Sequence, residues 1–257
     1  LPFDSYSIAW DRRQILYFAL YYLALTVPFL FAGLGIGGAL AASRGRSHLV
    51  YAANLLGSGL GVALAPLALW LAGVPGSVLI AALLGLLVVE AVEPNWSLSW
   101  RWSCRIGGLA MTVGVILLGV TNLAGRAPLG MSISSYKGLA YARQYPGAKN
   151  LYARWNAISR LDVVAGAGTR QLPGLSYTYP GMPPEQIGLS IDADSLQAVN
   201  LVAPEMFEAG DFLPEALAFR LFPAASVLVL EPGGGLGVLQ AVTGGAREVV
   251  AVYSNPL

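Results

Sequence analysis

The residues best suited to chemistry form a glycine-rich turn near the carboxyl end of the sequence. The turn carries one carboxylate and three glycines in a G-x-G-x-G pattern: Glu231, Gly233, Gly235 and Gly237. An apolar run at residues 226–230 precedes it, and a second run at residues 248–253 follows the start of a helix. Glycines here let the turn tighten and let a ligand approach the backbone beside the positive end of a helix dipole. The spacing predicts a β-α-β unit for a nucleotide-type ligand.

Other residue types with useful chemistry are scarce. The sequence has one cysteine, Cys104, and one histidine, His48. An internal disulfide needs two cysteines, and zinc and iron–sulfur sites need several such ligands. We therefore expect neither a disulfide within the chain nor a metal centre. The net charge of +1 gives no reason to expect a nucleic-acid partner.

The first half of the sequence has the composition of a membrane domain. The whole chain is 56% apolar and only 11% charged, whereas soluble domains are usually about 25% charged. A membrane-spanning helix needs about 20 mostly apolar residues, and three long stretches without Asp, Glu, Lys or Arg are long enough for four of them. We predict spans at approximately residues 14–41, 49–71, 75–91 and 106–123. Between the last two we expect an interfacial loop with Trp96, Trp100 and Trp102.

Three regions follow from these patterns. Residues 1–126 form the transmembrane helical domain, residues 127–225 a β-rich segment, and residues 226–257 the start of a Rossmann-like domain. In the last two regions, short β-branched or aromatic runs between turn formers predict strands. They lie at residues 160–164, 175–179, 187–191, 196–202, 226–230 and 248–253, with a helix at 212–221. The continuous apolar run at 226–230 is typical of a buried parallel strand.

A family resemblance rests on several of these segments. The run Glu231-Pro-Gly-Gly-Gly-Leu-Gly, followed by Gly245-Ala-Arg-Glu-Val-Val-Ala-Val, resembles the first motif and second strand of S-adenosylmethionine-type folds. It is most similar to the spermidine synthase (aminopropyltransferase) branch. The segments Ser135-Tyr-Lys-Gly-Leu, Trp155-Asn-Ala-Ile-Ser-Arg-Leu-Asp-Val and Ile191-Asp-Ala-Asp resemble the β-rich lead-in of that branch. The membrane half resembles the multi-spanning region fused to such domains in bacterial membrane proteins.

The resemblance implies a fold, a cofactor and a site. It implies an α-helical membrane domain followed by a β-rich segment and a Rossmann-like nucleotide-binding domain, which binds S-adenosylmethionine or its decarboxylated form. The residues at the positions of the binding motifs are Glu231, Gly233, Gly235, Gly237 and Tyr253. The activity implied is aminopropyl or methyl transfer, in the bacterial inner membrane with the soluble part in the cytoplasm. No catalytic acid or base is assigned, because the family's aspartate motif lies beyond a fourth strand that this sequence does not reach.

Two positions depart from the family pattern and open an alternative. Tyr253 stands where the family carries an acidic residue for the ribose hydroxyls, and Leu236 stands where aminopropyltransferases carry an acid in the glycine loop. The alternative is therefore a non-catalytic membrane subunit that packs within a larger complex. Small residues spaced four apart on the first two predicted spans would support packing against other subunits or self-association. We expect the sequence to be a piece of a longer polypeptide, or the ordered part of one.

Overall fold

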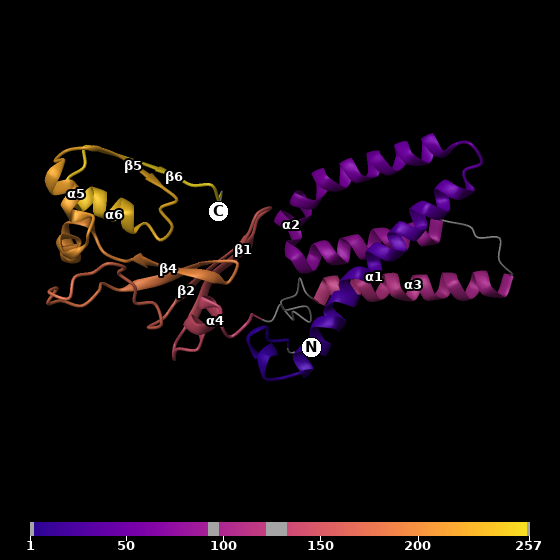
Figure 1. Cartoon of the computed structure of the whole chain (residues 1–257), viewed down its shortest axis with the longest axis horizontal. Coiled ribbons are helices and arrows are strands. Elements are labelled where there is room, and N and C mark those ends of the chain that lie inside the picture. Colours follow the sequence, from indigo (N-terminus) through magenta and orange to yellow (C-terminus); the bar gives the residue numbers. More distant parts are fainter. Residues whose placement is uncertain (1–2, 92–97, 122–132, 256–257) are drawn as a thin grey trace. The chain divides into compact units, whose positions relative to one another are not determined.

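The computed structural model describes residues 3–91, 98–121 and 133–255, and the chain divides into two compact units, Leu1–Ala65 and Pro66–Leu257. The domain boundary predicted near residue 126 lies outside the described residues. Long helices occupy the first half and short strands and helices the second (Figure 1).

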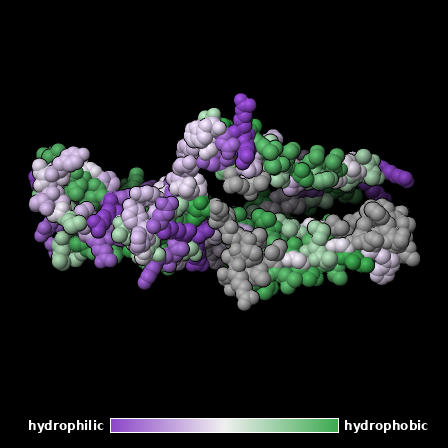
Figure 2. All heavy atoms as spheres, turned by 90° about the horizontal axis from the view of Figure 1, so that it is seen from below, coloured by the Kyte–Doolittle hydropathy of each residue, from purple (hydrophilic) through white to green (hydrophobic). Residues whose placement is uncertain are grey.

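Two of the three long helices are apolar around their whole circumference. The short 3₁₀ turn η1 Tyr6–Ala9 is followed by three helices, α1 Arg13–Ala42, α2 Ser47–Ala91 and α3 Leu98–Thr121. Two segments, Arg13–Ala42 and Ser47–Val88, are long and apolar enough to cross a membrane. The buried share of the most apolar stretch is 0% in the first segment and 6% in the second. Hydrophobic side chains cover the visible surface of the helices (Figure 2). A helix apolar on every side is stable in a large core or in lipid, and within the described residues these two segments are almost entirely exposed.

Gly73 divides α2 into two helical segments. Its φ of 64° and ψ of −177° are not helical, and this φ favours glycine because an L side chain is strained there. The division falls where the sequence predicts the break between its second and third spans. In α3 the apolar part, Arg105–Leu117, is shorter than a full span.

The predicted interfacial loop is wrong in its second half. The helix α3 begins at Leu98, so that Trp100 and Trp102 lie on a helix, whereas Trp96 lies outside the described residues. The predicted span at residues 106–123 is based on apolar residues alone. It therefore omits the polar and aromatic first turns of α3.

Four antiparallel strands form the centre of the second half. They are β1 Lys149–Trp155, β2 Arg160–Ala165, β3 Gln186–Ile191 and β4 Asp194–Asn200, hydrogen-bonded in the order β1-β2-β3-β4. A short helix, α4 Gly138–Arg143, packs on one face, where Leu139 and Ala142 meet Val164. Because successive strand residues point to opposite faces, the partly buried Leu161 and Leu189 lie on the other face. The strands at 160–164 and 187–191 are confirmed, and the strand predicted at 196–202 is β4, which begins two residues earlier.

A second, smaller layer follows the sheet. It contains η3 Pro204–Met206, η4 Glu208–Phe212, α5 Ala216–Leu221, β5 Ser226–Leu230, α6 Leu236–Thr243 and β6 Glu248–Val252. The strands β5 and β6 pair in parallel from Ser226 opposite Glu248 to Leu230 opposite Val252, and α6 lies beside them (Figure 1).

Three sequence predictions in this region need correction. Residues 175–179 are not a strand, because Leu175 and Tyr179 instead pack around Phe207 and Leu213 in a local apolar cluster. The helix predicted at 212–221 is shorter, since η4 ends at Phe212 and α5 begins at Ala216. The strand β5 is parallel as predicted but not buried: Leu230 is 67% exposed in the part of the chain that the structure describes.

A buried carboxylate fastens α4 to the sheet. The side chain of Asp162 is 1% exposed, and its Oδ1 accepts hydrogen bonds from Arg160 Nη2 at 2.8 Å and from Arg143 Nη2 at 3.2 Å. Arg143 is the last residue of α4 and Arg160 the first of β2. Charge-assisted hydrogen bonds of this kind are stronger than neutral ones. They therefore hold the helix and the strand in one position.

We predict that Asp162→Asn lowers the free energy of local unfolding of the sheet by about 2 kcal/mol, because both arginines lose an ionised acceptor. Hydrogen exchange of the detergent-solubilised chain measures this as faster exchange in β1–β3. Asp194→Asn is the matched control, since the Asp194 side chain is exposed. Equal protection of β2 in the two variants would contradict the role given to Asp162.

Candidate functional site

The glycine-rich turn connects β5 to α6 and follows a tightly constrained path. Glu231 has a φ of 49°, Gly233 of 53° and Gly235 of 82°, so the chain turns through left-handed conformations at alternate residues. Gly235 is the residue before the first turn of α6. A Cβ at Gly234 would collide with the carbonyl oxygen of Ala198 in β4. The turn therefore needs glycine both for its conformation and for its close approach to the four-stranded sheet.

A glutamine from the sheet holds the turn in place. The Gly234 amide donates a hydrogen bond to Oε1 of Gln197 in β4 at 2.8 Å. The same side chain occupies the space beside Gly233, where a Cβ would collide with it. One of the backbone donors of the glycine-rich turn is thus already satisfied by the protein itself. Sequence reasoning missed Gln197, which lies 37 residues from Gly234 and in a different element.

Glu231 joins the carboxyl ends of the two parallel strands. Its amide donates to the carbonyl of Val252 at 2.9 Å, and its Oε1 accepts the amide of Ser254 at 2.9 Å. The side chain is exposed, and its second oxygen has no partner within the described residues. The carboxylate therefore fixes the chain after β6 while it still presents negative charge to solvent.

A cavity of about 420 Å³ lies between these strand ends and the four-stranded sheet. Its lining combines an apolar wall with a polar rim: Leu161, Leu189, Ile191, Glu231, Gly233, Tyr253 and Asn255. Three predicted site residues, Glu231, Gly233 and Tyr253, therefore come together. Gly235 and Gly237 do not line the cavity: Gly235 caps α6, and Gly237 lies in its first turn against Val229.

The turn between β1 and β2 supports the rim of this cavity. Asn255 accepts a hydrogen bond from Asn156 Nδ2 at 2.5 Å and donates from Nδ2 to Ser159 Oγ at 2.8 Å. Both hairpin residues are buried, at 4% and 6% exposure. Oδ1 of Asn156 also accepts the amides of Ile158 and Ser159. The hairpin turn and the residues after β6 are thus joined by hydrogen bonds. No local sequence pattern predicts these contacts.

The lining of the cavity carries negative charge only. Glu231 is the charged residue among those that line it, and no lysine or arginine belongs to this lining. A carboxylate without a neighbouring cation attracts positive charge and hydrogen-bond donors and repels phosphate. The aromatic ring of Tyr253, which is 54% exposed, offers a flat surface on which a base can stack. The cavity is therefore suited to an uncharged or cationic ligand that carries a flat ring.

Comparison with protein families, curated proteins and solved structures finds no family model, no curated protein and no solved structure that matches this chain. In the described residues there is also no group of three or more His, Cys, Asp or Glu side chains that could hold a metal ion.

We predict that Gln197→Leu loosens the glycine-rich turn by about 1 kcal/mol, because the Gly234 amide loses its acceptor while it stays partly buried. Hydrogen exchange of the peptide that contains Gly234 should accelerate, with little change in α4. Gln144→Leu, the same change at an exposed glutamine after α4, should leave the turn as it is. Unchanged exchange at Gly234 in the Gln197 variant would show that the turn holds its shape by itself.

Proposed function

We propose that this chain is an integral membrane protein with four spans. Its soluble part contains the first β-α-β unit of a Rossmann-like fold and binds an S-adenosylmethionine-class nucleoside for aminopropyl or methyl transfer. The observation that carries the proposal is the cavity of about 420 Å³ at the carboxyl ends of two parallel strands, beside the glycine-rich turn. Ligands of open parallel sheets bind at this edge. We place the protein in a bacterial inner membrane, with the soluble part in the cytoplasm.

Four spans are consistent with the helices. The Gly73 interruption divides α2 into two segments. The helix α3 has 24 residues, of which the apolar part Arg105–Leu117 covers only part of a crossing, and we propose that the residues after Leu117 complete it. Together with α1 these make four segments, which would return the chain to its starting side of the membrane.

The chemistry of the cavity favours a cationic adenosyl compound over a phosphorylated dinucleotide. The sulfonium and amino groups of S-adenosylmethionine and of its decarboxylated form are positively charged, and Glu231 is the charged residue of the lining. In this proposal Tyr253 stacks on the base or bonds to the ribose with its hydroxyl, and Leu161 and Leu189 form the apolar wall. The general acid or base of the transfer is not among the residues that we assign.

A second candidate function, a non-catalytic subunit of a membrane complex, is favoured by two observations. Gln197 already accepts the Gly234 amide that a ligand would otherwise meet. In addition, β5 and β6 present apolar side chains to solvent, with Leu228 at 60% and Val250 at 47% exposure. An exposed apolar strand face fits contact with another protein better than contact with water.

We expect saturable binding of S-adenosylmethionine or its decarboxylated form to the detergent-solubilised chain, measured by isothermal titration calorimetry. Glu231→Gln keeps the oxygen that accepts the Ser254 amide but removes the charge, and it should weaken binding about tenfold, which corresponds to one charge-assisted contact. Glu215→Gln, at an exposed position before α5, is the matched control.

Two results would count against this function. Absence of binding for both compounds, in a chain that shows the native exchange pattern, would exclude the nucleoside site. Recovery of stoichiometric membrane proteins with the non-binding chain would then support the subunit function.

A further inference from the structure

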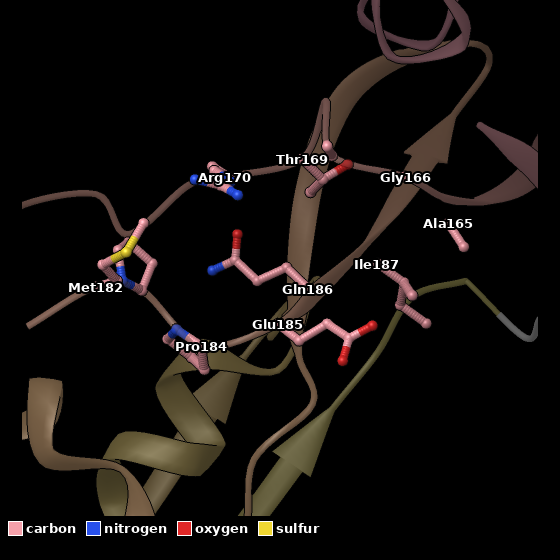
Figure 3. Close-up of a pocket in the computed structure, with 11 residues that line it drawn as sticks. Ala165, Gly166, Thr169, Arg170, Met182, Pro184, Glu185, Gln186 and Ile187 are labelled. Atoms are coloured by element: carbon pink, nitrogen blue, oxygen red, sulfur yellow. The ribbon is translucent and has the colours of Figure 1, made fainter. Parts of the chain in front are cut away.

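A second cavity lies in the connection between β2 and β3, and the glycine-rich site does not use it. Its volume is about 490 Å³, within the range of small-molecule sites. It forms between the segment after Ala165 and the segment from Met182 to Ile187 (Figure 3). No residue of its lining belongs to the lining of the first cavity.

Two opposite charges line this cavity without neutralising each other. No hydrogen bond or ion pair joins the side chains of Arg170 or Glu185 to any other described residue, and both residues are exposed. Figure 3 shows the side chain of Arg170 directed toward Gln186, whereas the Glu185 carboxylate extends the other way, toward Ile187. A cation and an anion held apart in one concave site form complementary ends for a ligand that carries both charges.

The middle of the cavity is rigid and largely apolar. The amide group of Gln186, a residue 5% exposed, is fully engaged: it accepts the Gln171 amide at 2.8 Å and donates to Gln171 O at 2.9 Å and Asn200 Oδ1 at 2.7 Å. Pro183 and Pro184 stiffen the opposite segment. The wall between the two charges therefore offers aliphatic contact with few free donors or acceptors.

One polar atom of the lining lacks a partner. Thr169 is 3% exposed, and its hydroxyl has no hydrogen-bond partner within the described part of the chain. Buried hydroxyls normally have one, because an unsatisfied polar atom costs about 1–3 kcal/mol. The Thr169 oxygen lies against Gly188 of β3 and has almost no accessible surface, so the two charged side chains and not this hydroxyl offer contacts to a ligand.

From these observations we propose that the cavity in the β2–β3 connection binds a small zwitterion of the amino-acid type, in which a carboxylate and an ammonium are separated by a short aliphatic chain. The planar guanidinium of Arg170 pairs with the carboxylate in a two-point contact. Glu185 pairs with the ammonium, and Ile187, Pro184 and Met182 cover the aliphatic part. The site is independent of the nucleoside proposed for the first cavity.

The test uses the full chain in nanodiscs and three probes of increasing length: glycine, 4-aminobutanoate and 6-aminohexanoate. We expect saturable binding of at least one of them by calorimetry, with slower hydrogen exchange confined to residues 165–171 and 182–187. Butanoate and butylamine, which each carry one of the two charges, should bind about tenfold more weakly or less, because one ion pair is lost. No saturable binding of any of the three zwitterions up to about 50 mM, where millimolar sites are filled, overturns the proposal.

Two charge variants assign the ends of the ligand. Arg170→Gln and Glu185→Gln should each weaken binding of the best zwitterion about tenfold. Both side chains are exposed and unpaired in the described residues, so the exchange pattern of the free protein should be unchanged. Arg220→Gln, at an exposed arginine of α5 that pairs with Asp211, should bind as the unaltered chain does. Retention of full affinity in either charge variant, or equal affinity for butanoate, contradicts a two-charge site.

Discussion

The contact between the glycine-rich turn and the strand β4 is the constraint on which the candidate nucleoside site depends. Gly234 approaches the Ala198 carbonyl so closely that no Cβ fits, and its amide bonds to Gln197 at 2.8 Å. This contact brings the carboxyl ends of β5 and β6 over the sheet face that carries Leu161 and Leu189. The cavity exists because the two layers meet there, and Asn255 closes its rim by its hydrogen bonds with the β1–β2 turn. The site is therefore a product of long-range packing around a locally encoded turn.

A different constraint acts on the long helices, namely the polarity of the solvent around their apolar side chains. The most apolar windows of α1 and α2 bury 0% and 6% of their residues within the protein, so water cannot be their surroundings without a large exposed apolar surface. In lipid the same surface is favourable, and backbone polar groups are satisfied inside each helix.

Features encoded within a short stretch of sequence were predictable. The turn after β5, the parallel pairing of β5 with β6 and the apolar helices each follow from local composition and spacing. The composition of residues 175–179 predicts a strand, but Leu175 and Tyr179 pack against Phe207 and Leu213 instead. Gln197 and Asn255 could not be found as site partners, because each acts through a hydrogen bond to an element distant in the sequence. The same holds for the ion pair of Arg143 with Asp162, which joins α4 to β2 across 19 residues of sequence.

The central claim is that a cationic adenosyl compound occupies the cavity beside Tyr253. Direct ultraviolet cross-linking of radiolabelled S-adenosylmethionine to the full chain, followed by peptide mapping, tests it at the level of residues. The account predicts a label on the peptide that contains Tyr253, removed by excess unlabelled compound. A label that resists competition, or one placed on peptides remote from both strand ends, would contradict it.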